Sequence, residues 1–430
     1  MRKVIAIIGT LDTKEAEAQD LKNEIEKFQH NPILIDVSLR KPAQPIKGAD
    51  VTNEQVAKAG GSSIDAVADM EKGEAIDVMT AGGASIIRTL WCDGKINGVI
   101  GYGGSVGLAL TSTIMKILPF GVPKLIVTTI AGAAGRYIGA KDIVIFPSIT
   151  DLAGGENVNR IEAITLASAA GAISGMVEAK ATLPSEKPLV VASQFGVTTT
   201  HVQEAKNELE NKGYEVVAFH AVGTGGQSLE ELVKSGNVAG VLDVTTHEMA
   251  DELVGGVYGA GAERLDAAAE KAVPQVLLPG ALDMVNFFEP KTVPPQFDKR
   301  RFYYHNPNVT LMRTTKEECT ELGKIIATKI NKSRGPTVFL IPTKGFSEYD
   351  KVGAVKTVSY SGEETHLPWY DPEADVAFVS SLKSHVDNSK SNVEIIEVDR
   401  HINDPLMAHL SASILEDMMK GKWNKGKKYD

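Results

Sequence analysis

The sequence predicts an α/β protein made of two Rossmann-like domains, each a doubly wound parallel sheet, related to one another by duplication. Three observations predict this fold. The chain has 430 residues, which is more than one hydrophobic core usually holds. Short runs rich in valine and isoleucine alternate with helical patterns, as they do in parallel sheets covered on both faces. Similar strings also occur at corresponding strands of the two halves.

The first domain, residues 1–181, is expected to alternate strands with helices. Its predicted strands are 4–8, 33–37, 97–101, 123–127 and 142–146. Its predicted helices are 13–29, 63–76, 105–117 and 157–178. These assignments rest on apolar runs and on apolar residues recurring at helical spacing. The glycine-rich strings 82–83 and 154–157 are interpreted as turns.

A linker is predicted at residues 182–188, where two prolines and two charged residues separate a long helix from a new strand. The second domain follows as residues 189–430. Its predicted strands are 189–193, 215–219, 239–243, 275–278, 337–341, 376–380 and 394–398. Its predicted helices are 198–212, 228–235, 245–271 with a glycine-rich interruption, 315–331 and a closing helix 405–420.

Duplication is suggested by three pairs of strings that hold the same place in their strand–helix units. Residues 94–101 parallel 236–243, residues 121–127 parallel 272–278, and residues 8–13 parallel 195–200. Chance recurrence is the alternative, because Gly-Val and Val-Pro before apolar runs are common in parallel sheets. We favour duplication.

Composition and charge narrow the function classes. Apolar residues make up 43% and charged residues 23% of the chain, an ordinary globular balance. The formal net charge of −10 disfavours nucleic acid as a partner. The N-terminal apolar run is too short for a signal peptide or a membrane span, so we expect a cytoplasmic protein with no membrane partner. Cys92 and Cys319 are expected to be reduced, and no spacing typical of a dedicated metal site occurs.

The residues that follow the strands of the first domain point to a phosphate-binding site. In an open parallel sheet, ligands bind beyond the carboxyl ends of the strands. Glycine allows close backbone approach, hydroxyls donate hydrogen bonds, and helix N-termini attract anions. For Gly101–Gly107 the alternative is tight packing of helix on strand. The candidate phosphate-binding residues are Gly9, Thr10, Asp12, Thr13, Lys14, Gly101, Gly103, Gly104, Ser105, Thr128 and Thr129.

Single residues refine this interpretation. Asp12 or Thr13 is expected to cap the first helix. Lys14 would oppose the dipole of that helix, a cost that an anionic ligand would remove. No P-loop string occurs. An NAD-binding domain usually has an acidic residue at the end of the next strand to bind the ribose, whereas that strand ends here in Thr128-Thr129. Asp36 is either a ribose contact or a helix cap.

The strand ends of the second domain carry more ionisable residues. Asp243 and His247 follow one strand and Asp283 follows another. If the domains are duplicates, these three face one crevice. They could then act as general acid and base, or bind a divalent cation such as Mg²⁺. The alternative is that they are caps or hydrogen-bonded loop residues.

Four strings together suggest a family. They are residues 8–14, 101–107, 279–285 and 305–309. Their combination resembles the uncharacterised proteins related to the N-terminal, ATP-binding domain of the tomato mosaic virus resistance protein. The resemblance implies two Rossmann-like subdomains, ATP bound in the first, and a homodimer. It implies a phosphate role for Gly9–Thr13 and Gly101–Gly107.

Plant members of this family carry a further C-terminal domain for which this chain has no room, so an antiviral role is not transferred. The sequence therefore predicts an ATP-binding protein with a second, acidic crevice. As an enzyme it would perform ATP- or Mg-assisted chemistry on a small polar metabolite, with His247, Asp243 and Asp283 as its catalytic residues. The alternative is a nucleotide sensor or interaction module that breaks no bond.

Overall fold

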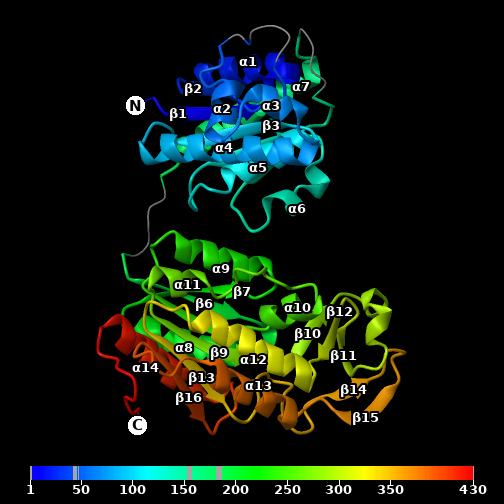
Figure 1. The fold of residues 1–430 in the computed structure, drawn as a ribbon, viewed down its shortest axis with the longest axis vertical. Helices are drawn as coiled ribbons and strands as arrows, with labels where there is room; N and C mark the ends of the chain where they lie inside the picture. Colours follow the sequence, from blue (N-terminus) through cyan, green and yellow to red (C-terminus); the bar gives the residue numbers. More distant parts are fainter. Residues whose placement is uncertain (1, 42–45, 47, 153–156, 181–185, 430) are drawn as a thin grey trace. The chain divides into compact units, whose positions relative to one another are not determined.

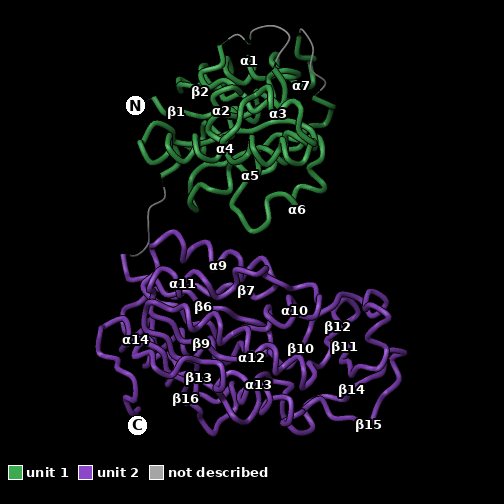
Figure 2. The backbone as a smooth tube through the Cα atoms, viewed as in Figure 1, with its two compact units in different colours: residues 1–182 green, residues 183–430 purple. Residues whose placement is uncertain are grey.

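The computed structural model describes residues 2–41, 46, 48–152, 157–180 and 186–429. It divides into two compact units, residues 1–182 and 183–430, which we call unit 1 and unit 2 (Figure 2). Part of the predicted linker and most of the predicted turn at 154–157 lie outside the described residues.

Unit 1 contains a five-stranded sheet in which every pair of neighbours is parallel. The strand order is β2-β1-β3-β4-β5. The chain leaves β1 for one edge of the sheet and returns to build the other, so the winding reverses between β1 and β3. Its strands are β1 (Val4–Gly9), β2 (Asn31–Asp36), β3 (Gly98–Gly103), β4 (Lys124–Thr128) and β5 (Val144–Pro147).

Helices cover both faces of this sheet (Figure 1). Ile5 and Ile7 pack with α1 (Leu11–Lys27) and α7 (Arg160–Glu178). Ala6 and Ile8 point to the opposite face, as alternation along a strand requires. That face is covered by α2 (Asn53–Ala59), α3 (Ile64–Asp69), α4 (Lys72–Cys92) and α5 (Ser105–Met115), with the short α6 (Gly135–Ile138) beyond.

One helix among the described residues, α7, is long and apolar enough by length and composition to cross a membrane. Its mean hydropathy is only 1.2, and 44% of the helix window is buried within the protein. The side chains Leu166, Ala169 and Ile173 pack into the same hydrophobic cluster as α1. These contacts are those of a core helix.

Unit 2 contains a six-stranded parallel sheet with the order β16-β13-β9-β8-β6-β7. Taken from the β7 edge, its first four strands follow the same order as β2-β1-β3-β4 of unit 1. The winding reverses between β6 and β8. The strands are β6 (Leu189–Gln194), β7 (Glu215–His220), β8 (Gly240–Thr245), β9 (Gln275–Gly280), β13 (Thr337–Pro342) and β16 (Val393–Val398).

This sheet is also covered on both faces. Val190 and Ala192 pack against α8 (Thr199–Asn211) and α14 (Pro405–Met419). Val191 points to the other face. The helices there are α9 (Thr224–Lys234), α10 (Glu248–Val254), α11 (Ala267–Lys271), α12 (Lys316–Ile330) and α13 (Pro372–His385). A doubly wound parallel sheet in each unit is therefore confirmed.

Unit 2 holds a second sheet that the sequence analysis missed. It is antiparallel, with the order β10-β12-β11-β14-β15. Its strands have only three to five residues, so none gives a long apolar run. They are β10 (Met284–Phe287), β11 (Phe302–Asn306), β12 (Val309–Arg313), β14 (Lys356–Val358) and β15 (Glu364–Pro368).

One predicted strand of unit 2 is wrong, whereas the glycine-rich interruption predicted within the helical stretch 245–271 is observed. Residues 376–380, predicted as a strand, lie inside α13. Asp371 caps that helix by accepting a hydrogen bond from the Ala374 amide at 3.2 Å, and Ala374, Phe378 and Leu382 bury one helical face. The predicted helix 245–271 is two short helices, α10 and α11, joined by a long loop.

Unit 1 contains two helices that were not predicted, α2 and α6, and it differs from the prediction around α4. The predicted helix 63–76 is divided between α3 and α4, and α4 continues through Gly82-Gly83, which were interpreted as a turn. A Cβ atom on Gly82 would lie 2.0 Å from the carbonyl oxygen of Val56 in α2. Gly82 is therefore needed for close helix packing.

Candidate functional site

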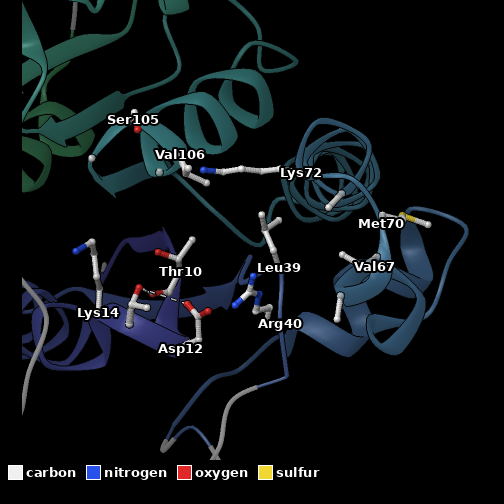
Figure 3. Close-up of a pocket in the computed structure, with 15 residues that line it drawn as sticks. Thr10, Asp12, Lys14, Leu39, Arg40, Val67, Met70, Lys72, Ser105 and Val106 are labelled. Atoms are coloured by element: carbon white, nitrogen blue, oxygen red, sulfur yellow. Dashed lines mark hydrogen bonds between the residues drawn. The ribbon is translucent and has the colours of Figure 1, made fainter.

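A pocket of about 560 Å³ opens in unit 1 where the winding of the sheet reverses. Its volume lies within the range of small-molecule sites. Four segments of the chain line it: the turn after β1, the turn after β3, and two that form a wall, namely Leu39-Arg40 after β2 and the stretch from α3 to the start of α4 (Figure 3). This is the place at which doubly wound sheets bind ligands.

The turn after β3 presents a helix N-terminus to the pocket. Helix α5 begins at Ser105, its N-cap is Gly104, and no side chain caps it. The first intrahelical hydrogen bond runs from the Leu108 amide to the Gly104 carbonyl at 2.8 Å. The amides of Ser105 and Val106, which line the pocket, therefore lack intrahelical partners and carry the positive end of the helix dipole.

Glycines shape this turn. Gly103 has a φ of +143°, and a Cβ on Gly107 would lie 2.9 Å from the Tyr102 carbonyl oxygen. Gly101 lies behind the turn, where a Cβ would come within 2.6 Å of the Thr111 Cβ. Gly101 therefore allows tight packing of α5 on β3, the alternative that the sequence left open, while Gly104 lines the pocket.

The turn after β1 offers side chains. Helix α1 begins at Leu11, two residues earlier than predicted, and neither Asp12 nor Thr13 is its N-cap. The Leu11 amide donates to Asp36 Oδ1 at 3.2 Å, and the Asp12 amide donates to Ser38 Oγ at 3.0 Å. Residues at and after β2 thus satisfy the first amides of α1. Asp36 thus helps to cap α1, although Thr10 is its N-cap residue, and burial raises the pKa of Asp36.

The side chains of this turn still reach the pocket. Thr10, Asp12, Thr13 and Lys14 all line it. Lys14 has non-helical backbone angles, and its ammonium donates a hydrogen bond to the Leu152 carbonyl. Gly9 does not line the pocket, and a Cβ there would lie 2.3 Å from the Tyr102 ring.

Two cationic residues that the sequence analysis missed, Arg40 and Lys72, line the same pocket. Figure 3 shows the Arg40 side chain beside Asp12 and the Lys72 side chain extending toward Val106. Within the described part of the chain, neither head group has a hydrogen-bond or ion-pair partner. Lys72 is the first residue of α4. Its positive charge therefore opposes the dipole of that helix, as was expected of Lys14 in α1, and an anionic ligand would remove this cost.

Thr128 and Thr129 are not among the described residues that line the pocket. Thr128 is buried, and its hydroxyl accepts a hydrogen bond from the Ile130 amide at 3.3 Å. The Thr129 hydroxyl would lie 3.6 Å from a Cβ on Gly104. Thr129 is therefore a neighbour of the turn after β3, while Thr128 stabilises the end of β4.

In unit 2, Asp243 belongs to a buried ion network. Its two carboxylate oxygens accept hydrogen bonds from Arg264 at 2.5 and 2.8 Å, and Oδ1 also accepts from Ser193 Oγ at 2.5 Å. Arg264 further donates to Glu248 at 2.7 Å and to Glu230 at 3.3 Å. Burial raises the pKa of both glutamates. This network ties β8 to α9, α10 and the loop before α11.

His247 lies just after β8 and is fully buried. Its ring stacks on Phe195 with centroids 4.4 Å apart, and neither ring nitrogen has a hydrogen-bond partner among the described residues. Burial, with the nearby Arg264 and His220, lowers its pKa to about 3, so the imidazole is neutral at pH 7. The Asp251 carboxylate is 4.0 Å from Nε2, too far for a hydrogen bond. Burial raises the pKa of Asp251 to about 7.

Asp283 belongs to a second buried network. Its Oδ2 accepts hydrogen bonds from Ser347 at 2.9 Å and from the Trp369 indole at 2.8 Å, while Oδ1 has no hydrogen-bond partner in the described part of the chain. Burial and the nearby Asp350 raise its pKa to about 6. Arg313 lies 2.9 Å from Asp375 and 3.5 Å from Asp350, and burial raises the pKa of Asp350 to about 8.

The described structure therefore places Asp243 and Asp283 in separate networks, around Arg264 and Arg313. No hydrogen bond or ion pair between described residues joins Asp243, His247 and Asp283. Among the described residues, no group of three or more His, Cys, Asp or Glu side chains is arranged to hold a metal ion.

Comparisons with known proteins agree with the resemblance read from the motifs. The model of the N-terminal domain of an uncharacterised protein family, UPF0261, matches residues 3–182, and the model of its C-terminal domain matches residues 187–419. A UPF0261 protein of Clostridium tetani is 44% identical over 97% of this chain and 100% of its own length. One of Rhizobium meliloti is 38% identical over 97% of this chain and 99% of its own.

The tomato ToMV resistance protein Tm-1(GCR237) is 35% identical over 95% of this chain, which spans only 55% of that protein. Among solved structures, MurG of Acinetobacter baumannii is 11% identical, covering 97% of this chain and 100% of that one, with a TM-score of 0.23. UDP-N-acetylglucosamine 2-epimerase of Rickettsia bellii is 12% identical, covering 64% and 78%, with a TM-score of 0.21. Similarity this low says nothing about the ligand.

Proposed function

The chain belongs to the uncharacterised protein family UPF0261, and we propose that its unit 1 binds ATP, with the triphosphate in the pocket between β1 and β3. The observation that carries the proposal is the uncapped N-terminus of α5 in a pocket that also contains Arg40 and Lys72, whose head groups have no partner among the described residues. Free amides and cationic side chains are what phosphate groups bind. Thr10, Thr13 and Ser105 add hydroxyl donors to the same pocket.

Magnesium fits this proposal as a companion of the phosphates. Mg²⁺ usually binds to one or two carboxylates together with substrate phosphates and waters. Among the described residues that line the pocket, Asp12 is the only acidic one, and it is exposed. Asp12 is the carboxylate that would hold the metal. The metal would offset part of the phosphate charge.

For unit 2 we propose ligand sensing as the role that the geometry favours over catalysis. Both oxygens of Asp243 are occupied by Arg264, and Asp283 lies in a different network. The neutral, unpartnered His247 is the strongest remaining candidate for an acid–base residue, for chemistry on a small polar metabolite. Phosphorus NMR of ATP incubated with the protein separates the two roles. Turnover that disappears in His247→Ala would favour the enzyme.

Two further expectations remain proposals. The shared strand order of the two parallel sheets supports their origin by duplication, and an experimental structure in which β1, β3 and β4 fail to superpose on β6, β8 and β9 would contradict it. An exposed Cys92 and a buried Cys319, both free, suit a reducing cytoplasm. The expected cytoplasmic location is tested by cell fractionation of the tagged protein.

The proposed binding is tested by thermal-shift titration with ATP, ADP, AMP, NAD and phosphate, each with and without Mg²⁺. A ligand that binds only the folded state raises its stability by mass action, by about 2.7 kcal/mol at a hundred times Kd. We expect ATP with Mg²⁺ to raise Tm most. An equal response to phosphate alone would point to a phosphorylated metabolite, and no response to any of these ligands would contradict the proposal.

A further inference from the structure

The unit 1 pocket has two chemically different ends. At one end lie Thr10, Asp12, Thr13, Lys14, Gly104 and Ser105, beyond β1 and β3. At the other lie Leu39, Val67, Ala68, Met70 and Ala75, from the wall formed by the chain after β2, α3 and the start of α4. Figure 3 shows Val67 and Met70 on the opposite side of the pocket from Lys14 and Ser105. None of the five side chains at the second end carries a nitrogen or oxygen atom.

The cationic residues come from three different segments. Lys14 is in α1, Arg40 follows β2, and Lys72 begins α4. Among the described lining residues they are opposed only by the single carboxylate of Asp12. Because the Lys14 ammonium already donates to the Leu152 carbonyl, Arg40 and Lys72 are the two cations whose head groups are available to a ligand. Two cations on separate segments suit an extended polyanion better than a single phosphate.

We propose that this pocket recognises the length of the phosphate chain and not the identity of the base. The inference rests on the proposed nucleotide binding. Arg40 and Lys72 contact the phosphate chain between the uncapped N-terminus of α5 and the base. The base lies against Leu39, Val67 and Met70, whose side chains contribute apolar contact only.

This arrangement has a direct consequence for specificity. A site discriminates strongly between related ligands when it offers hydrogen-bonding groups that the wrong ligand leaves unpaired, whereas apolar contacts discriminate weakly. Adenine and guanine differ in their hydrogen-bonding groups and little in the size of their flat faces. The pocket should therefore bind ATP and GTP alike and bind AMP much more weakly than either.

The test is isothermal titration calorimetry of the full chain with ATP, GTP, ADP, AMP and inorganic tripolyphosphate. Arg40→Gln and Lys72→Gln should each weaken ATP and tripolyphosphate binding, by roughly tenfold for the loss of one charge-assisted contact. Lys41→Gln is the matched control. Lys41 is an exposed neighbour of Arg40 that pairs with Glu54 at 3.7 Å and does not line the pocket, so its removal should leave both affinities unchanged.

A second variant addresses the apolar end. Met70→Ala should weaken ATP and GTP binding to the same extent and leave tripolyphosphate binding unchanged, because the inorganic chain has no base. We expect wild-type affinities for ATP and GTP to agree within about threefold.

The possible failures are distinct. If no nucleotide and no tripolyphosphate binds the wild-type protein, the proposed function fails and this inference fails with it. If ATP binds and GTP binds far more weakly, nucleotide binding stands and indifference to the base is overturned. If ATP binds but Arg40→Gln and Lys72→Gln behave as Lys41→Gln does, the contact of these two cations with the phosphates is overturned.

Discussion

Buried ionisable residues in unit 2 are held in two ways. Arg264 is surrounded by carboxylates, which together raise its pKa well above the usual value despite its burial. His247 has no hydrogen-bond partner at either ring nitrogen, and burial lowers its pKa. Removing one member of a buried ion network leaves an uncompensated charge, whereas removing a neutral, unpartnered imidazole leaves none. His247 is therefore the residue whose replacement is informative.

His247→Phe should remove part of the acid sensitivity of the fold. An unfolded histidine takes up a proton near pH 6.5, but folded His247 does so only near pH 3. In that window the unfolded state binds more protons, so wild-type stability falls as pH falls. At pH 5 the loss from this residue is on the order of 2 kcal/mol. The phenylalanine ring can still stack on Phe195, and the variant should lack this loss.

Urea denaturation at pH 7.5, 6 and 5 measures the effect. His366→Gln, at an exposed position of β15, is the control and should follow the wild-type pH dependence. Asp251 is present in all three proteins. Because its pKa is raised to about 7 in the folded state, its contribution to stability is lost as pH rises, which is opposite to the effect of His247. Equal pH dependence in the wild type and His247→Phe would show that the folded imidazole is protonated as easily as the unfolded one.

At the scale of elements, the glycines of β3 and α5 connect packing to the pocket. Gly101 lets α5 approach β3, which sets the position of the helix N-terminus beside the pocket. A side chain at Gly101 would meet the Cβ and Cγ2 atoms of Thr111 at 2.6 and 2.7 Å. Neither atom is the far end of a flexible chain, so the helix itself would have to move.

Gly101→Ala should therefore destabilise unit 1 by about 1–3 kcal/mol, the usual cost of overpacking a core. Gly175→Ala is the matched control. Gly175 lies inside α7 with nothing within 4 Å of an added Cβ, and alanine there should stabilise by about 0.5–1 kcal/mol. Thermal unfolding of the two variants measures these changes in stability. Equal changes in Tm would mean that Gly101 is not needed for the packing of α5 on β3.

The same elements show what a sequence can predict. Apolar strands such as β1 and β8 are predictable because each is buried on both faces. The 376–380 segment was misread because a short apolar run does not distinguish a buried strand from a buried helix. Thr10 and Ser105 of the pocket were predictable from strand ends. Arg40 lies four residues beyond the end of β2 and Lys72 begins a helix that covers the sheet, so only tertiary structure brings both to the pocket.

At the scale of the whole molecule, each unit has its own hydrophobic core. The clusters on the two faces of the unit 1 sheet contain only residues before Thr182, and those of unit 2 contain only residues after Leu183. Every described residue that lines the candidate nucleotide pocket belongs to unit 1. Folding and nucleotide binding of unit 1 should therefore not require unit 2.

Residues 1–182 produced alone should unfold cooperatively and bind ATP with the affinity of the full chain, because the fragment retains every described residue that lines the pocket. Calorimetric titration of the isolated unit, after circular dichroism has shown that it is folded, makes the comparison, and Arg40→Gln in the same fragment should reproduce the weakening seen in the full chain. A folded fragment that fails to bind ATP, beside a full chain that binds it, would mean that unit 2 supplies part of the site. Equal affinities would instead restrict any role of unit 2 to events after binding.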